Sequence, residues 1–126
     1  MPIYITILKI IVTIGFLLAG IAKLLGAKPI VDQFREFKLP VKAMYLVGIL
    51  EVSGAIALYC PTLALASAIG LALLMVGVIA NHLKVKHPFS KYLPSFILFI
   101  LTALLALFLK QQGYTLPFGL NDALPW

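Results

Sequence analysis

The chain has 126 residues, of which 63% are apolar and 11% charged, and its mean hydropathy is +1.11. A soluble domain carries about twice that charged fraction, and a chain of 13.7 kDa is too small to bury so much apolar surface within itself. The composition therefore excludes an ordinary soluble protein and indicates an integral membrane protein. Ten Lys and Arg stand against four Asp and Glu. In a membrane protein this excess marks loops beside an anionic leaflet, so nucleic acid is not an expected partner.

Four stretches are long and apolar enough to cross a bilayer. A hydrocarbon core of about 30 Å needs roughly 20 helical residues at about 1.5 Å each. We expect spans at about residues 3–25, 41–59, 62–82 and 92–109. Lipid offers no hydrogen-bond partner to an unpaired backbone, so each span should be a helix. The sequence thus predicts an all-α fold: one transmembrane domain over residues 1–126, an antiparallel four-helix bundle. The first stretch is expected to be a retained span, because its apolar run outlasts that of a typical signal peptide.

Two further segments lie outside the expected spans. In residues 29–38, Ile30, Phe34 and Phe37 recur at helical spacing while charged residues occupy the other side. This pattern predicts a short amphipathic helix at the membrane interface between the first two spans, anchored by its apolar side in lipid. Binding of a partner by this helix is the alternative. Residues 111–126 interleave aromatic residues with proline, which predicts a tail folded back on the membrane surface.

The basic residues predict the orientation of the bundle. Most of them lie on the side that carries the two longer loops, whereas only Lys9 and Lys110 lie on the other. Basic loops face the cytoplasm, so we expect these loops to be cytoplasmic. The residues on the basic side are Lys23, Lys28, Arg35, Lys38, Lys42, Lys84, Lys86 and Lys91.

Stripes of small residues mark where helices approach each other in lipid. Each of the first three spans has such a stripe, and each stripe includes a polar residue. We therefore expect the three stripes to pack together with their polar groups facing inward. The stripes comprise Gly15, Ala19 and Lys23 in the first span, Gly48, Glu51 and Gly54 in the second, and Ala66, Gly70, Gly77 and Asn81 in the third.

Glu51 is the residue most indicative of function. It follows Val41 by ten residues, about 15 Å along a helix and thus near the middle of the bilayer. A charge there costs at least about 2.5–3.5 kcal/mol, so the carboxyl must face protein, pair with a cation, or be protonated. Lys23 ends the first span on the same side of the membrane as Asn81 and His82 end the third. We expect these four residues to form a ligand-binding cluster; a purely structural ion pair that fixes helix register is the alternative.

Other chemistry has little support in the sequence. His82 and His87 are five residues apart and match no metal-binding pattern, so no metal site is expected. One cysteine, Cys60, excludes a disulfide or a cysteine cluster within the chain. No serine is accompanied by a base. We assign no catalytic residue, and whether the protein is an enzyme stays open.

Several runs of the sequence resemble a known family. The first contains a Gly-x-x-Lys element ending at Lys23, the second an element Glu-x-x-Gly starting at Glu51, and the third ends in Asn81-His82. The runs are residues 16–24, 48–55 and 75–82, with Phe34 to Pro40 between the first two. Together they resemble the DoxX-like family of small four-span membrane proteins, over residues 10 to 110. In this resemblance Lys23, Glu51 and His82 match the polar positions of the family.

The resemblance implies a function linked to quinones or to assembly. DoxX-type proteins have been linked to quinone-dependent oxidation as the membrane subunit of a larger enzyme, and an animal branch acts as an assembly chaperone for receptors. Our leading hypothesis is a membrane subunit of a bacterial inner membrane that binds a lipophilic molecule such as a quinone near Lys23, Glu51 and His82. A redox protein partner would supply the redox centre, because the sequence has no haem, flavin or iron–sulfur ligation pattern of its own. The alternatives are a non-catalytic chaperone packed against a client protein and a proton-coupled exporter of lipophilic cations. Each involves contact with membrane lipid, and a homo-oligomer is compatible with all three.

Overall fold

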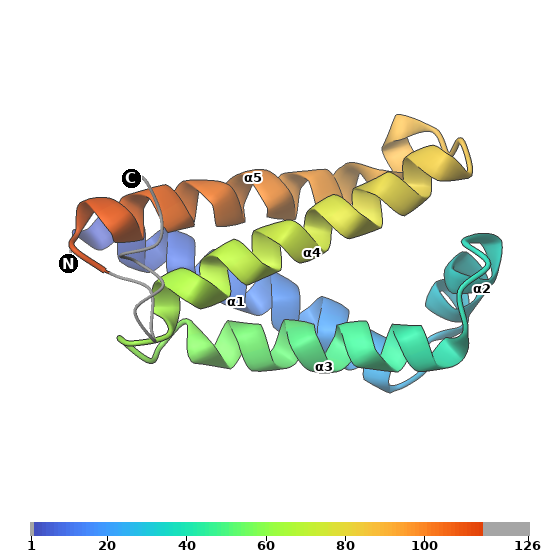
Figure 1. Cartoon of the computed structure of the whole chain (residues 1–126), viewed down its shortest axis with the longest axis horizontal. Coiled ribbons are helices and arrows are strands. Elements are labelled where there is room, and N and C mark those ends of the chain that lie inside the picture. The colour runs from blue at the N-terminus through green and yellow to red at the C-terminus, as the bar shows by residue number, and fades with distance from the viewer. Residues whose placement is uncertain (1, 115–126) are drawn as a thin grey trace, which may run out of the picture.

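The structure is a computed structural model that describes residues 2–114, and these residues form five helices joined by short turns (Figure 1). The order confirms the predicted all-α fold with a short helix between the first two long ones. Most of the predicted surface tail, residues 111–126, lies outside the described residues. The helices are α1 (Ile3–Leu24), α2 (Lys28–Glu36), α3 (Val41–Ala57), α4 (Ala64–Lys84) and α5 (Phe89–Gln111).

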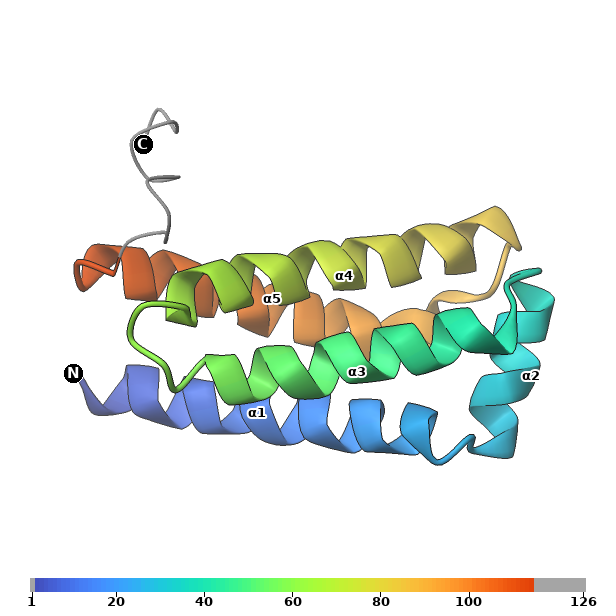
Figure 2. The ribbon, with the colours of Figure 1, turned by 60° about the horizontal axis from the view of Figure 1, so that its bottom comes forward.

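The four long helices form an antiparallel bundle in which the chain runs up and down (Figure 2). Helix α1 packs against α3 and α5, and α4 packs against the same two helices. Neighbours in the chain are therefore neighbours in space, as the short connections require.

Length and composition fit these helices to a membrane. Helices α1, α4 and α5 are each long and apolar enough to cross it. Helix α3 has 17 residues, which is about the shortest length that spans a bilayer. It passes the same test only together with α2, from which it is bent by 117°. Large apolar side chains are exposed on all four long helices, and lipid is the solvent that accepts them.

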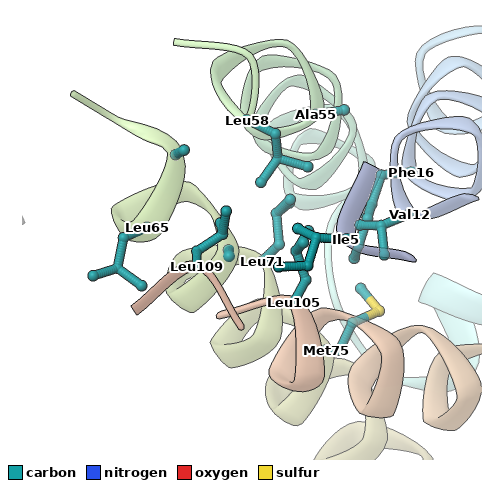
Figure 3. Close-up of a cluster of buried hydrophobic side chains, with 12 residues drawn as sticks. Ile5, Val12, Phe16, Ala55, Leu58, Leu65, Leu71, Met75, Leu105 and Leu109 are labelled. Carbon is teal, nitrogen blue, oxygen red and sulfur yellow. The ribbon is translucent and has the colours of Figure 1, made fainter. Parts of the chain in front are cut away.

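The apolar core lies in the half of the bundle away from α2, and Figure 3 shows its side chains. Thr102 is buried there, and its hydroxyl donates to the Leu98 carbonyl at 2.6 Å. Its polar group is thus satisfied within α5. The core residues include Ile5, Val12, Phe16, Ala55, Leu58, Leu65, Leu71, Met75, Leu105 and Leu109.

Glycines bring α1 and α3 into backbone contact. A Cβ atom on Gly20 would lie 2.9 Å from the Gly48 carbonyl oxygen, and one on Gly48 would lie 3.0 Å from the Gly20 oxygen. A side chain at either position would require the facing backbone to shift. The predicted close approach of the first two spans is confirmed, but the contact uses Gly20, which the first stripe did not include, and Gly15 of that stripe meets Leu98 of α5 instead. The contact sets Lys23, one turn after Gly20, beside α3.

The predicted inward packing of the third stripe is wrong. Gly70 and Gly77 are exposed, and a Cβ atom on either would meet nothing within 4 Å. The buried side of α4 carries Ala68, Leu71 and Met75 instead. These residues fill the space between α4 and its neighbours, whereas small residues are common on membrane helices whichever way they face.

Helix α2 lies across one end of the bundle (Figures 1 and 2). Phe34 and Phe37 on its apolar side are buried against the bundle, and the Phe37 ring meets the His82 ring edge-on at 4.9 Å. The expectation that these side chains anchor the helix in lipid is therefore wrong. The turn after α2 folds this apolar face onto the open end of the bundle, where protein rather than lipid covers it.

Candidate functional site

A cavity of about 210 Å³ lies beneath α2, with side chains from all five helices in its walls. We call it the site pocket. Its polar lining contains three of the four predicted site residues. The lining residues are Ala19, Lys23, Ile30, Gln33, Phe34, Glu51, Met75, Val78, His82, Lys91, Pro94, Ser95 and Leu98.

An ion pair between Lys23 and Glu51 lies in this pocket. Lys23 Nζ is 2.7 Å from Glu51 Oε1, and the side chains are 12% and 0% exposed. The backbone contact of Gly20 with Gly48 places the two side chains within reach. Apart from this ion pair, the Glu51 carboxylate has no polar partner among the residues that the structure describes. A carboxylate has about four acceptor positions, so the buried group retains the capacity to accept a hydrogen bond from a ligand.

His82 reaches the pocket from the last turn of α4. Its Nε2 lies 3.2 Å from Gln33 Nε2, and its Nδ1 lies 2.8 Å from His87 Nδ1. The Phe37 and Tyr92 rings lie against it. The ring is therefore held on both nitrogens and shielded by aromatic neighbours.

Asn81 is not part of the site pocket, contrary to the prediction of one cluster of four. Its Nδ2 donates to the Gly77 carbonyl at 2.9 Å, and it lines a separate cavity of about 150 Å³ beside Phe37. Successive residues of an α-helix point about 100° apart. Asn81 and His82 therefore cannot face the same pocket from one helix.

Several pocket and neighbouring residues escaped the prediction. Gln33 and Glu36 lie one turn apart on α2, and the sequence pattern placed Glu36 on a solvent-exposed face. In the folded chain Glu36 Oε2 lies 2.5 Å from His87 Nε2 and 3.5 Å from Lys91 Nζ. The hydrogen bond from His87 lowers the pKa of Glu36 below its usual value, with Lys91 acting in the same direction. The only signal in the sequence was that charged residues, Glu36 among them, lie on one side of the expected short helix; it did not identify His87 as the partner of Glu36.

Within residues 2–114 no three His, Cys, Asp or Glu side chains converge to hold a metal ion. His82, His87 and Glu36 follow one another in a line of hydrogen bonds instead.

A larger groove of about 510 Å³ runs between α3 and α4. Ser53 and Ser67 are its polar side chains, and the rest of its lining is Gly, Ala and Leu. Because it contains no charged or ring-nitrogen group, the smaller site pocket is the better candidate for specific binding.

One family model matches residues 7–106, most of the chain and all of the site pocket. The chain belongs to the DoxX-like family. The resemblance seen in the sequence is thereby confirmed, and this DoxX-like chain is a polytopic membrane protein. Neither a curated protein nor a solved structure matches it.

Proposed function

We propose that this DoxX-like protein binds the headgroup of a lipophilic molecule, such as a quinone, in the site pocket. The observation that carries the proposal is the buried carboxylate of Glu51, which has one cationic partner and free acceptor capacity inside a cavity. Such an intramembrane acid is costly, and a ligand hydroxyl would give it a second partner.

The size of the pocket suits a headgroup rather than a whole lipid. At about 210 Å³ it is smaller than the roughly 300 Å³ at which pockets for drug-sized ligands begin. A ring would occupy it while an isoprenoid tail remained among the lipid chains. Ala19, Met75, Val78 and Leu98 supply apolar surface for the faces of a ring.

The polar residues offer complementary bonds to the two oxygens of a quinone or quinol. The Lys23 ammonium can donate to a ring carbonyl, and the Glu51 carboxylate can accept a hydroxyl hydrogen. His82 can serve as donor or acceptor according to its tautomer. A bound quinone would supply two-electron redox chemistry, and an associated redox protein would exchange the electrons.

We also infer that the α2 end faces the cytoplasm of a bacterial inner membrane. Eight of the ten Lys and Arg residues of the sequence lie at that end. The positive-inside bias supports this orientation.

Quinone retention tests the proposal. The protein is purified in mild detergent with added short-chain ubiquinone, and the bound quinone is extracted and measured. We expect wild type and the exposed-site control Asp32→Asn to retain it. Glu51→Gln should bind about 10- to 100-fold more weakly, the loss expected for a hydrogen bond to a charged group. Equal retention by folded Glu51→Gln and wild type would refute quinone binding at Glu51.

The same variants separate the two alternative hypotheses. An assembly chaperone would capture a defined membrane client and would do so equally well as Glu51→Gln. An exporter of lipophilic cations would confer dye resistance that disappears in Glu51→Ala.

A further inference from the structure

A continuous line of hydrogen-bonded side chains leads from the site pocket to the surface. Gln33 and His82 line the pocket. From His82 the line continues to His87 through the two Nδ1 atoms, 2.8 Å apart, and then to Glu36 through His87 Nε2, 2.5 Å from Oε2. Helices α2 and α4 and the α4–α5 connection contribute to it, so it exists only in the folded bundle.

The bonding partners fix where each hydrogen lies. The Glu36 carboxylate only accepts, so His87 Nε2 must donate to it. In a neutral ring His87 Nδ1 then accepts, and His82 Nδ1 donates to it. His82 Nε2 is left as an acceptor, and the Gln33 amide nitrogen, 3.2 Å away, donates to it. All three hydrogen bonds point the same way, from the pocket towards Glu36, with both rings neutral.

Exposure increases along this line. His82 is 1% exposed, the His87 side chain 10% and the Glu36 side chain 46%. The Phe37 ring lies against both histidine rings, at 4.9 Å and 5.8 Å. The line therefore starts in a shielded pocket and ends at a carboxylate in contact with water.

We propose that His82, His87 and Glu36 form a proton path between the site pocket and water at the α2 end. The inference rests on the proposed function, because a ligand hydroxyl in the pocket is the proton donor. When that hydroxyl replaces the Gln33 amide at His82 Nε2, its O–H bond breaks and the bonding electrons stay on the oxygen. The resulting oxyanion lies in the pocket that holds the Lys23 ammonium.

The proton balance closes along the path. His82 gains a proton at Nε2 and loses one from Nδ1 to His87. His87 gains it at Nδ1 and loses one from Nε2 to Glu36, which releases a proton to water. Both rings stay neutral and change tautomer. The hydrogen bonds of the path then run in the opposite direction, from Glu36 towards the pocket, and in this state the path carries a proton inward. The charged groups that face the path are Lys91 from α5, beside Glu36, and the Lys23–Glu51 pair across the pocket.

Histidine-nitrogen NMR of the full chain in lipid nanodiscs, without added quinone, tests the arrangement. The chain has two histidines, and His87→Phe assigns their signals. At a pH where both rings are neutral, we expect His82 to carry its hydrogen on Nδ1 and His87 on Nε2, with scalar coupling across the Nδ1 pair. A neutral His82 with its hydrogen on Nε2, or no coupling, would overturn the path.

Proton exchange tests the transfer itself. In Glu36→Gln the amide oxygen still accepts from His87 but cannot take up its proton. We expect exchange of the His82 Nδ1 hydrogen with water to become about a hundredfold slower, as for loss of a proton-transfer group. His87→Phe, which retains a ring against Phe37, should be as slow, and the matched α2 variant Asp32→Asn should match wild type. Unchanged exchange in either folded variant would overturn the proposal. Because no quinone is present, this result is independent of the retention assay.

Discussion

At the scale of single residues, the buried Lys23–Glu51 pair is held by α1 and α3 at 2.7 Å. Desolvating two charges cancels much of their attraction, so a buried ion pair contributes little net stability. Removing one partner is different, because the other charge is left uncompensated. Ligand binding, as proposed, and a structural clamp between α1 and α3 are the two explanations for such a pair.

A double-variant series measures this balance. Glu51→Ala should lower the free energy of unfolding by about 3–5 kcal/mol, because the Lys23 ammonium loses its partner. Lys23→Met combined with Glu51→Met should be close to wild type in stability yet retain no quinone. The measurement is reversible unfolding of the purified protein in mixed detergent micelles. A double variant as unstable as the single one would identify the pair as a structural clamp.

At the scale of helices, the contact of α1 with α3 sets the geometry of the site. The two backbones touch at Gly20 and Gly48, which brings a side chain one turn later on α1 to the middle of α3. The sequence stripes of small residues included Gly48 but not Gly20. The stripe on α4 gave a wrong prediction, because Gly70 and Gly77 face outward. A stripe of small residues allows another helix to approach closely, but it does not show that a helix packs there.

Alanine substitutions should distinguish a glycine at the α1–α3 contact, Gly20, from an exposed glycine on α4, Gly70. Gly20→Ala places a Cβ 2.7 Å from Val52 Cγ2 and 2.9 Å from a carbonyl oxygen. Such overpacking should destabilise the bundle by about 1–3 kcal/mol and weaken quinone retention. Gly70→Ala meets nothing within 4 Å and should be neutral or stabilising by up to about 1 kcal/mol, the helix preference of alanine. Both are measured by the same unfolding assay. Equal effects at the two positions would show that the α1–α3 contact is not tight.

At the scale of the whole molecule, the two ends of the bundle differ in chemistry. The α2 end carries the site pocket and most of the basic residues, whereas the opposite end contains the apolar core and the tight turn with Cys60 (Figure 1). Cys60 Sγ lies 3.3 Å from the Thr62 hydroxyl, and this hydrogen bond lowers the pKa of the thiol. The more abundant thiolate makes Cys60 a suitable probe of orientation.

Thiol labelling in intact cells tests the orientation. We expect a membrane-impermeant maleimide to label Cys60 in wild type, because the proposed orientation places the turn after α3 away from the cytoplasm. In a Cys60→Ser, Lys86→Cys variant the new thiol lies at the α2 end and should be labelled only after the membrane is permeabilised. The opposite pattern would show that the bundle is inverted relative to the positive-inside prediction.

The sequence by itself determined the features of the fold that depend on its apolar composition and on the helical spacing of its residues. Apolar runs of spanning length require helices in lipid, and a carboxyl group ten residues into a span must face protein, pair with a cation or be protonated. These arguments predicted four long helices, the short helix between the first two, and an inward-facing Glu51. The spacing Gly20 to Lys23 and Glu51 to Gly54 also indicated the family.

Only the tertiary structure decided which side chains meet across long stretches of chain. Glu36 and His87 are 51 residues apart, and Gln33 and His82 are 49 apart. Their contacts depend on the turn that folds α2 over the bundle and on the rotation of α4 about its axis. A rotation of about 100° would exchange His82 for Asn81 in the pocket. The periodicity of the sequence does not determine the rotation of a helix about its axis, because lipid can contact either of its faces. Close packing against the neighbouring helices determines it.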